Sequence, residues 1–114
     1  MMHDWNEYQQ QLLATIGEMA KISPDTVSGY GSLSKAGAKT GHLDAKTREL
    51  IALAVAVTRQ CDGGITIHTD AAVKHGATRE EVMEALGVAI AVNAGAALVY
   101  SARVMDAYSA KTEP

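Results

Sequence analysis

Apolar residues recur every three or four positions along most of the chain, which is the spacing of one face of an α-helix. Residues 4 to 21 show this spacing clearly, and Asp4 stands where a helix N-cap is expected. The predicted apolar face of this helix consists of Trp5, Tyr8, Leu12, Ile16 and Met19. No alternating pattern of useful length indicates a β-strand, so the sequence predicts an all-α fold.

Capping residues and chain breakers predict where the next helices begin. Ser23 suits the cap of a second helix and Pro24 its first turn. The glycines in this segment weaken the helix prediction, and we expect the helix to end near Lys39. The segment "LDAKTRELIALAVAVTRQ", residues 43–60, is the clearest helix, with Asp44 as its N-cap. Its middle is apolar on nearly every side, which predicts a central helix with an inner stripe of Leu50, Leu53, Ala54 and Val57.

The second half of the chain predicts two or three more helices. Gly63 and Gly64 are expected to interrupt the central helix and turn the chain, and a helix closed by Gly76 follows. Thr78 and Glu81 form a capping box that opens a helix to about residue 91. A last helix, from 93 to about 109, can be continuous with it. We therefore expect one domain, residues 1–114, built as a bundle of about five to six helices.

Composition excludes some partners. The net charge of -3 and pI near 5.7 argue against nucleic-acid binding, and no basic run indicates a membrane surface. The longest apolar stretch, residues 85–100, is shorter than a membrane span and contains Asn93, which predicts a buried helix. The N-terminus resembles no secretory signal, so we expect a cytoplasmic protein. Abundant small residues bury little area each, which favours stabilisation by oligomerisation.

Candidate chemistry is concentrated in the segment "QCDGGITIH", residues 60–68, which contains the only cysteine. On a helix, Cys61, Gly64 and His68 share one face. A helix N-terminus and a nearby protonated imidazole both favour the thiolate, which is the nucleophilic form of cysteine. The alternative interpretation is structural, with Cys61 as a small buried residue and His68 as a core histidine.

Other site classes have little support in the sequence. No two histidines are spaced with a carboxylate as a metal pair, so no metal is predicted. "GYGSLSKAG" lacks the ending of a phosphate-binding loop, and no serine-centred nucleophile motif is present. We therefore predict neither a metal nor a bound cofactor.

The segment "LDAKTRELIALAVAVTRQCDGGITIHTDAAVKHGATREEVMEALGVAI" resembles the carboxymuconolactone decarboxylase family, in particular its alkylhydroperoxidase AhpD-like branch. That branch carries a glutamate, eleven residues, a cysteine, two residues, a second cysteine, three residues and a histidine. Glu49, Cys61 and His68 match this spacing, whereas Gly64 replaces the second cysteine. The resemblance covers roughly residues 42 to 105.

The resemblance implies a thiol-dependent oxidoreductase that reduces alkyl hydroperoxides, with Cys61 as the thiol and with Glu49 and His68 as proton carriers. Without a second thiol at position 64, oxidised Cys61 needs an external thiol or dithiol reductant, which predicts impaired turnover. The sequence leaves open whether Gly64 is natural or introduced. The family also implies a homotrimer or homohexamer with sites near subunit contacts.

Two further functions remain open at this level. The decarboxylase branch works without a cysteine pair, and there Glu49, Arg48 and His68 would bind a lactone carboxylate and protonate a carbanion. A non-catalytic oligomeric subunit is the third possibility. Glu49 has a structural alternative as well, as a surface carboxylate paired with Lys46 or Arg48. In one continuous helix Glu49 and Cys61 do not share a face, so their meeting requires a turn of the chain between them.

Overall fold

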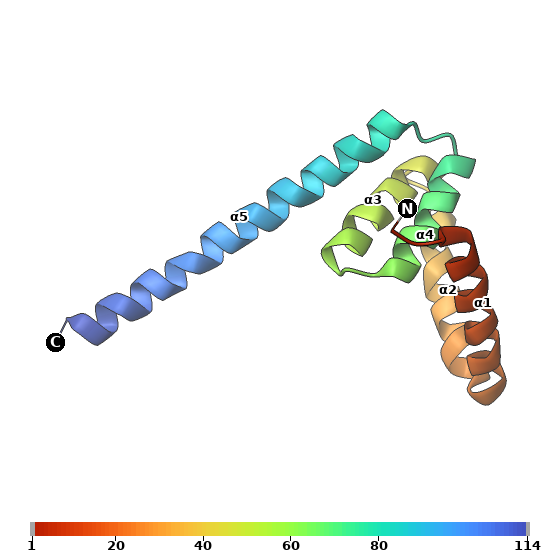
Figure 1. The fold of residues 1–114 in the computed structure, drawn as a ribbon, viewed down its shortest axis with the longest axis horizontal. Helices are drawn as coiled ribbons and strands as arrows, with labels where there is room; N and C mark the ends of the chain where they lie inside the picture. The colour runs from red at the N-terminus through yellow and green to blue at the C-terminus, as the bar shows by residue number, and fades with distance from the viewer. Residues whose placement is uncertain (1, 114) are drawn as a thin grey trace.

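The computed structural model describes residues 2–113, which form five helices and contain no strand. The prediction of an all-α fold is therefore confirmed (Figure 1). In chain order the helices are α1 (Trp5–Ile22), α2 (Pro24–Thr40), α3 (Ala45–Thr58), α4 (Asp62–Lys74) and α5 (Arg79–Thr112).

The predicted caps Asp4 and Asp44 begin their helices as the sequence indicates, whereas Ser23 stands at the N-cap of α2 without a side-chain capping hydrogen bond. The Asp4 side chain accepts from the Glu7 N–H at 3.1 Å, and the Asp44 side chain accepts from the Thr47 N–H at 2.8 Å. The hydrogen bonds with Thr47 lower the pKa of Asp44. These contacts satisfy backbone donors that the first turn of a helix otherwise leaves unpaired. Local chemistry therefore sets both helix starts.

The turn between α3 and α4 differs from the prediction. Gly63 and Gly64 do not interrupt a helix, because both lie in the first turn of α4. The chain turns instead around Gln60, whose φ of 53° is left-handed, and Cys61 then caps α4. The glycine at 63 has a packing role, since a Cβ there would lie 2.8 Å from a methyl carbon of Leu12 in α1. The two glycines allow close approach of other helices instead of breaking the chain.

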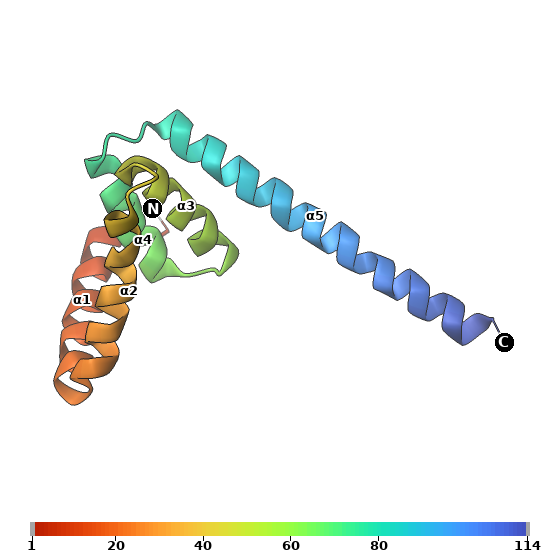
Figure 2. The same cartoon turned by 180° about the vertical axis from the view of Figure 1, so that it is seen from behind.

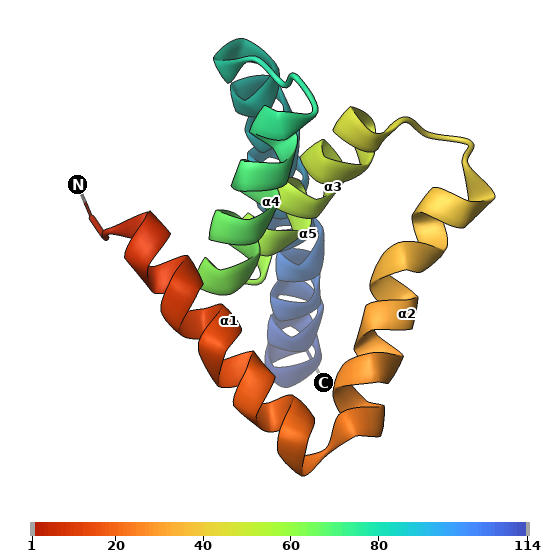
Figure 3. The ribbon, with the colours of Figure 1, turned by 90° about the vertical axis from the view of Figure 1, so that its right-hand side faces the viewer.

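The central position of α3 is confirmed, because α3 packs against both α4 and α5. Leu53 and Ala56 of α3 are buried, together with Ala72 of α4 and Ala89 of α5. The predicted inner stripe is only partly correct, since Val57 is 40% exposed. α1 packs against α4 and α2, and Figure 3 shows α1 and α2 diverging from their junction. The buried core is thus small and consists mainly of small side chains.

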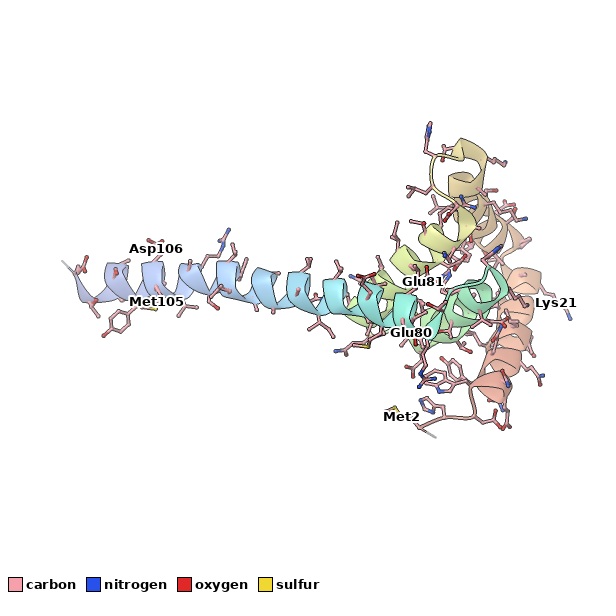
Figure 4. The ribbon with its side chains drawn as sticks, turned by 90° about the horizontal axis from the view of Figure 1, so that it is seen from above. Met2, Lys21, Glu80, Glu81, Met105 and Asp106 are labelled. Carbon is pink, nitrogen blue, oxygen red and sulfur yellow. The ribbon has the colours of Figure 1, made fainter. Side chains whose placement is uncertain are left out.

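The C-terminal part of the chain forms one helix of 34 residues. Asn93 donates a hydrogen bond to the Thr58 hydroxyl at 2.8 Å, near the end of α3. Beyond this point α5 extends away from the other helices, as both faces of the molecule show (Figures 1 and 2). Figure 4 places Met105 and Asp106 on this distal part, far from Glu81. The prediction that residues 85–100 are buried is wrong for the single chain, where Ala89 alone is buried.

The single chain exposes much more surface than a compact protein of its size. Its accessible surface is 9020 Å², whereas a compact monomer of 12.0 kDa is expected to expose about 6,000 Å². Its radius of gyration is 19.0 Å, against about 13 Å for a compact domain of this length. Helix α5 is also the one helix among residues 2–113 that is long and apolar enough to cross a membrane, by length and composition.

An ion pair and a capping box fix the start of α5 against α3. The Thr78 hydroxyl accepts from the Glu81 N–H, and the Glu81 carboxylate accepts from the Thr78 N–H. The same carboxylate lies 2.7 Å from Nζ of Lys46. The Lys46 hydrogen bond and the Thr78 N–H hold the pKa of Glu81 below its usual value, and Glu81 raises the pKa of Lys46. These contacts orient the base of the long helix.

Replacing Glu81 tests this anchor through its pH dependence. Because the pKa of Glu81 is lowered on folding, its stabilisation is present above its ordinary pKa and is lost as pH falls through the lowered value. We expect Glu81→Gln to lower the melting temperature at pH 7, with the difference from the unmodified chain shrinking in acid. Glu80→Gln, in the same turn, is the control for net charge. Equal effects of the two substitutions at all pH values would contradict the assignment.

Candidate functional site

Glu49 and His68 meet across the packed faces of α3 and α4. Nδ1 of His68 lies 2.7 Å from Oε2 of Glu49, and both side chains are largely but not fully shielded, at 29% and 22% exposure. The turn around Gln60 brings these two residues together, because it folds α4 back along α3. The sequence analysis requires a turn of the chain before Glu49 can approach residues of α4. The structure contains this turn, and it brings Glu49 to His68.

The contact defines which ring nitrogen of His68 is free. An ionised carboxylate can only accept hydrogen bonds, so Nδ1 of His68 carries the proton that Glu49 accepts. Nε2 is then left to accept or donate a proton elsewhere. A carboxylate that orients an imidazole in this way is a common arrangement in general acid–base catalysis.

Cys61 stands at the beginning of the same helix. Its sulfur accepts a hydrogen bond from the Gly64 N–H at 3.2 Å, as the N-cap of α4. The residue is exposed, so the interpretation of Cys61 as a small buried side chain is wrong for the single chain. Backbone N–H groups and the positive end of the helix dipole favour negative charge at this sulfur.

The structure does not bring the thiol into direct contact with the Glu49–His68 pair. Within residues 2–113, the Cys61 sulfur hydrogen-bonds to Gly64 and to neither Glu49 nor His68. Cys61 and His68 are seven residues apart, which corresponds to about 10 Å along a helix axis. Side chains of a helix lean toward its N-terminus, so His68 leans toward Cys61. Proton transfer between them therefore needs a substrate or a water molecule in the intervening space.

Position 64 retains the geometry of a cysteine pair. A Cβ built on Gly64 would lie 3.6 Å from Cβ of Cys61 and 3.4 Å from its sulfur. The Cβ atoms of disulfides are typically about 3.5–4.5 Å apart. The same Cβ would lie 3.1 Å from Cβ of Ala56, which is tighter than ordinary van der Waals contact. A side chain at 64 thus fits a disulfide with Cys61 after a small adjustment between α3 and α4.

The neighbours of Glu49 on α3 are engaged elsewhere. Lys46 pairs with Glu81, and Arg48 donates from its guanidinium to the backbone oxygen of Leu43. The alternative in which Glu49 is a surface carboxylate paired with Lys46 or Arg48 is therefore wrong. No group of three or more metal-ligating side chains, from His, Cys, Asp or Glu, occurs in the described part of the chain.

The structure adds two residues near Cys61 that the sequence did not single out. Nε2 of His3 lies 3.5 Å from the carboxylate of Asp62, the residue directly after Cys61. A cavity of about 450 Å³, lined by residues 3–6, adjoins this contact. A second cavity, of about 310 Å³, lies between α1 and α4 and is lined in part by Gln9, Thr66 and Asp70. No sequence spacing could reveal the His3 contact, because it joins positions 59 residues apart through the packing of α1 on α4.

Comparison with known proteins assigns the family. The model of the carboxymuconolactone decarboxylase family matches residues 24–107, which include α2 to α4 and most of α5. The chain belongs to the carboxymuconolactone decarboxylase family. The crystal structure of apo-lpg0406, a carboxymuconolactone decarboxylase family protein from Legionella pneumophila, has a TM-score of 0.74 and 38% identity, covering 92% of this chain and 94% of that one.

Bacterial relatives share most of the chain length. A protein of Haemophilus influenzae is 49% identical over 96% of both chains. Uncharacterized protein H16_B0147 of Cupriavidus necator is 33% identical over 82% of this chain and 83% of its own. Uncharacterized protein 4 in cox locus of Paracoccus denitrificans is 37% identical, over 81% and 83% respectively. These relatives match the chain over most of its length, and none of their names gives an activity.

Nuclear magnetic resonance of the histidine rings tests the Glu49–His68 contact. At a pH where His68 is neutral, we expect the proton to reside on Nδ1, because Glu49 accepts it. Glu49→Leu removes the acceptor and should shift the ring toward the Nε2-protonated form, whereas His75 at the end of α4 should not change. A ring of His68 that is protonated mainly on Nε2 in the unmodified protein would disprove the contact.

Proposed function

We propose that this protein is an AhpD-like, thiol-dependent oxidoreductase that reduces organic hydroperoxides with Cys61 as its redox thiol. The observation that carries the proposal is the 2.7 Å contact between Glu49 and His68, formed on the helix that Cys61 caps. Cys61 and the imidazole of that pair thus belong to the same helix, about two turns apart. The electrons come from an external thiol, because the chain has a single cysteine.

The chemistry proceeds in three balanced steps. The Cys61 thiolate attacks a peroxide oxygen, the O–O bond breaks, and the departing alkoxide takes a proton to leave as an alcohol. Cys61 is thereby oxidised to a sulfenic acid. An external thiol then forms a mixed disulfide with Cys61 and releases water. A second external thiol attacks that mixed disulfide. This restores the Cys61 thiol and releases a disulfide formed by the two external thiols.

Glu49 and His68 serve the first step. With Nδ1 bound to Glu49, Nε2 of His68 is the ring nitrogen available to exchange protons with the reacting groups. In this proposal the peroxide binds between Cys61 and His68, which are separated by a rise of about 10 Å along α4. The carboxylate of Glu49 holds the ring orientation and stabilises the imidazolium during the proton exchange.

Gly64 determines how the oxidised thiol is resolved. In a dithiol site the second thiol closes a disulfide within the chain, and here the first external thiol replaces it. The backbone at 64 still has the Cβ geometry of a disulfide with Cys61. A slow step that depends on the concentration of external thiol is therefore expected of this chain.

One observation favours a second candidate, a lyase of the decarboxylase type. The Glu49–His68 contact is complete without Cys61, whose sulfur does not bond to either residue among those described. Such a pair can protonate a carbanion without a thiol. Arg48 gives this candidate no support in the single chain, because its guanidinium is bound to the Leu43 backbone oxygen.

A peroxide-consumption assay with a dithiol reductant tests the proposal and its competitor. We expect slow turnover by the unmodified chain, none above background by Cys61→Ser, and faster turnover by Gly64→Cys. Activity that survives Cys61→Ser would contradict the thiol mechanism. Consumption of a lactone acid without any thiol would favour the lyase. The absence of both activities from all three chains would leave a non-catalytic subunit.

We further propose that the protein works as a homotrimer or homohexamer in the cytoplasm, assembled through α5. The excess exposed surface of about 3,000 Å² is far more than the roughly 800 Å² that each partner buries in a standard interface. Apart from Asn93, residues 85–100 of α5 are apolar on all sides, which is typical of a helix that is covered on all sides. A membrane is the less favoured partner of α5. Asn93 lies in the middle of the uncharged residues 85–100 and is hydrogen-bonded to a side chain of α3.

Substitutions in the distal half of α5 test this assembly. Leu98 is 76% exposed in the single chain. We expect Leu98→Glu to raise the concentration needed for half-assembly by about 100-fold or more, since it places a charge in an apolar interface. Leu98→Met is the matched control and should assemble normally. Light scattering that gives one 12.0 kDa chain for the unmodified protein, or binding to lipid vesicles instead of assembly, would contradict the proposal.

A further inference from the structure

Helices α1 and α2 form a hairpin whose apolar side chains are poorly covered. Neither helix contains a buried residue, and α2 packs mainly against α1. Figure 3 shows the two helices diverging from their junction. Tyr30 and Leu33 of α2 are 66% and 75% exposed in the single chain. Because most helical stability in proteins comes from packing of an apolar side, α2 lacks a partner for that side.

The apolar side chains of α2 lie together on one side of the helix. Val27, Tyr30 and Leu33 follow one another at steps of three residues. The charged residues Lys35 and Lys39 stand five and nine positions after Tyr30, which places them on the opposite side. This side of α2 can therefore pack against another apolar helix without burying a charge.

The free part of α5, residues 94–112, carries a similar apolar stripe. Its members Tyr100, Val104 and Tyr108 are exposed and follow at steps of four residues. Tyr100 lies eleven residues after Ala89, which is buried, and eleven residues make about three turns of a helix. Val104 lies eleven residues after Asn93, which is hydrogen-bonded to α3. The stripe thus continues the side of α5 that already packs within the chain.

A single chain keeps these two surfaces apart. Figures 1 and 2 show α5 extending to one side of the molecule, while the α1–α2 hairpin lies on the other side. The free part of α5 is about 28 Å long, and α2, with 17 residues, is about 25 Å long. A second copy therefore supplies a helix that matches α2 in length and in its apolar side.

We propose that the apolar side of α2 is the docking surface for the free part of α5 from a second copy of this chain. The inference rests on the proposed function, because it names the surface that receives α5 in the assembly proposed there. Docking covers both surfaces that the single chain exposes, whereas pairing of two α5 helices would leave α2 exposed. The roughly 800 Å² that each partner buries in a standard interface is well within the excess surface of about 3,000 Å².

The proposed contact joins two different surfaces, and this bears on the symmetry of the assembly. A contact between unlike surfaces is heterologous, and repeated contacts of this kind form a closed ring when the rotation between copies closes. Each copy then donates its own α5 and receives the α5 of a neighbour, which agrees with the homotrimer proposed above.

A charge placed on each side of α2 tests the docking surface. We expect Leu33→Glu to raise the concentration needed for half-assembly by about tenfold or more, because it places an unpaired charge in an apolar contact. Ser28→Glu adds the same charge on the opposite side of α2 and should assemble as the unmodified chain does. Equal effects of the two substitutions on assembly would overturn the inference.

Disulfide trapping identifies the surface that α5 meets, in chains whose native thiol is removed by Cys61→Ser. Mild oxidation should link chains covalently when Leu33→Cys is combined with a cysteine at one or more of three positions of α5, namely Tyr100→Cys, Val104→Cys and Tyr108→Cys. Chains with one introduced cysteine should remain at 12.0 kDa on a denaturing gel. The same is expected of Ser28→Cys combined with each α5 variant, which is the matched control.

The other outcomes separate this inference from the proposed function. A covalent dimer from Val104→Cys alone would show that two α5 helices pair with each other, which would overturn the inference. Assembly that persists without any link between α2 and α5 would overturn it as well, while the proposed assembly would stand. A single 12.0 kDa chain in solution, or binding to phosphatidylcholine vesicles instead of assembly, would contradict both. Neither experiment uses peroxide, so the peroxidase activity is judged separately.

Discussion

The hydrogen bond between Glu49 and His68 is the interaction on which the functional account depends. It places a carboxylate and an imidazole between two helices, at 2.7 Å, where each is largely shielded from water. A carboxylate in such a position requires a partner, and the imidazole supplies it. The contact also engages Nδ1 of the ring with Glu49 and leaves Nε2 for the proposed proton exchange. Without this bond, the carboxylate of Glu49 and the imidazole of His68 would both lie between α3 and α4 without pairing with each other.

Glycine and small residues make that packing possible. A Cβ at Gly63 or Gly64 of α4 would lie very close to Leu12 of α1 or to Ala56 of α3. The buried core is built mainly from alanines, so the helix axes approach closely while little apolar area is removed from water. A single chain with such a core and an exposed, apolar α5 has a weak basis for stability on its own. The proposed association through α5 would supply the missing burial, which would account for both the small core and the exposed long helix.

The sequence predicts the local features of this fold well. Caps at Asp4, Asp44 and Thr78, the αL glycine at 76 and the central position of α3 all depend on neighbouring residues, and the structure confirms them. The role of the two glycines after Cys61 was predicted wrongly, because a close approach by α1 cannot be seen in a single segment. Burial of residues 85–100 was also predicted wrongly for the single chain, since hydrophobicity does not say which molecule covers a helix.

The candidate site shows the same difference between local features, which the sequence predicts, and contacts between helices, which it does not. The resemblance to the AhpD-like branch implies that Glu49, Cys61 and His68 act together, and the structure brings Glu49 to His68 while it leaves Cys61 about two helical turns away. The His3–Asp62 contact carries no sequence signal, because it depends on where the N-terminal segment meets α4. Spacing along one helix is therefore predictable, whereas contacts between helices follow from packing.

The most direct measurement is the rate at which a hydroperoxide oxidises Cys61 to the sulfenic acid, trapped chemically and followed by mass spectrometry, in Glu49→Gln, His68→Ala and the double variant. If the pair acts as one unit on the thiol, each single substitution slows oxidation by about tenfold or more and the double variant is no slower than the slower single variant. Oxidation of Cys61 at the unmodified rate in His68→Ala would contradict the account, because the imidazole would then have no part in the chemistry of the thiol.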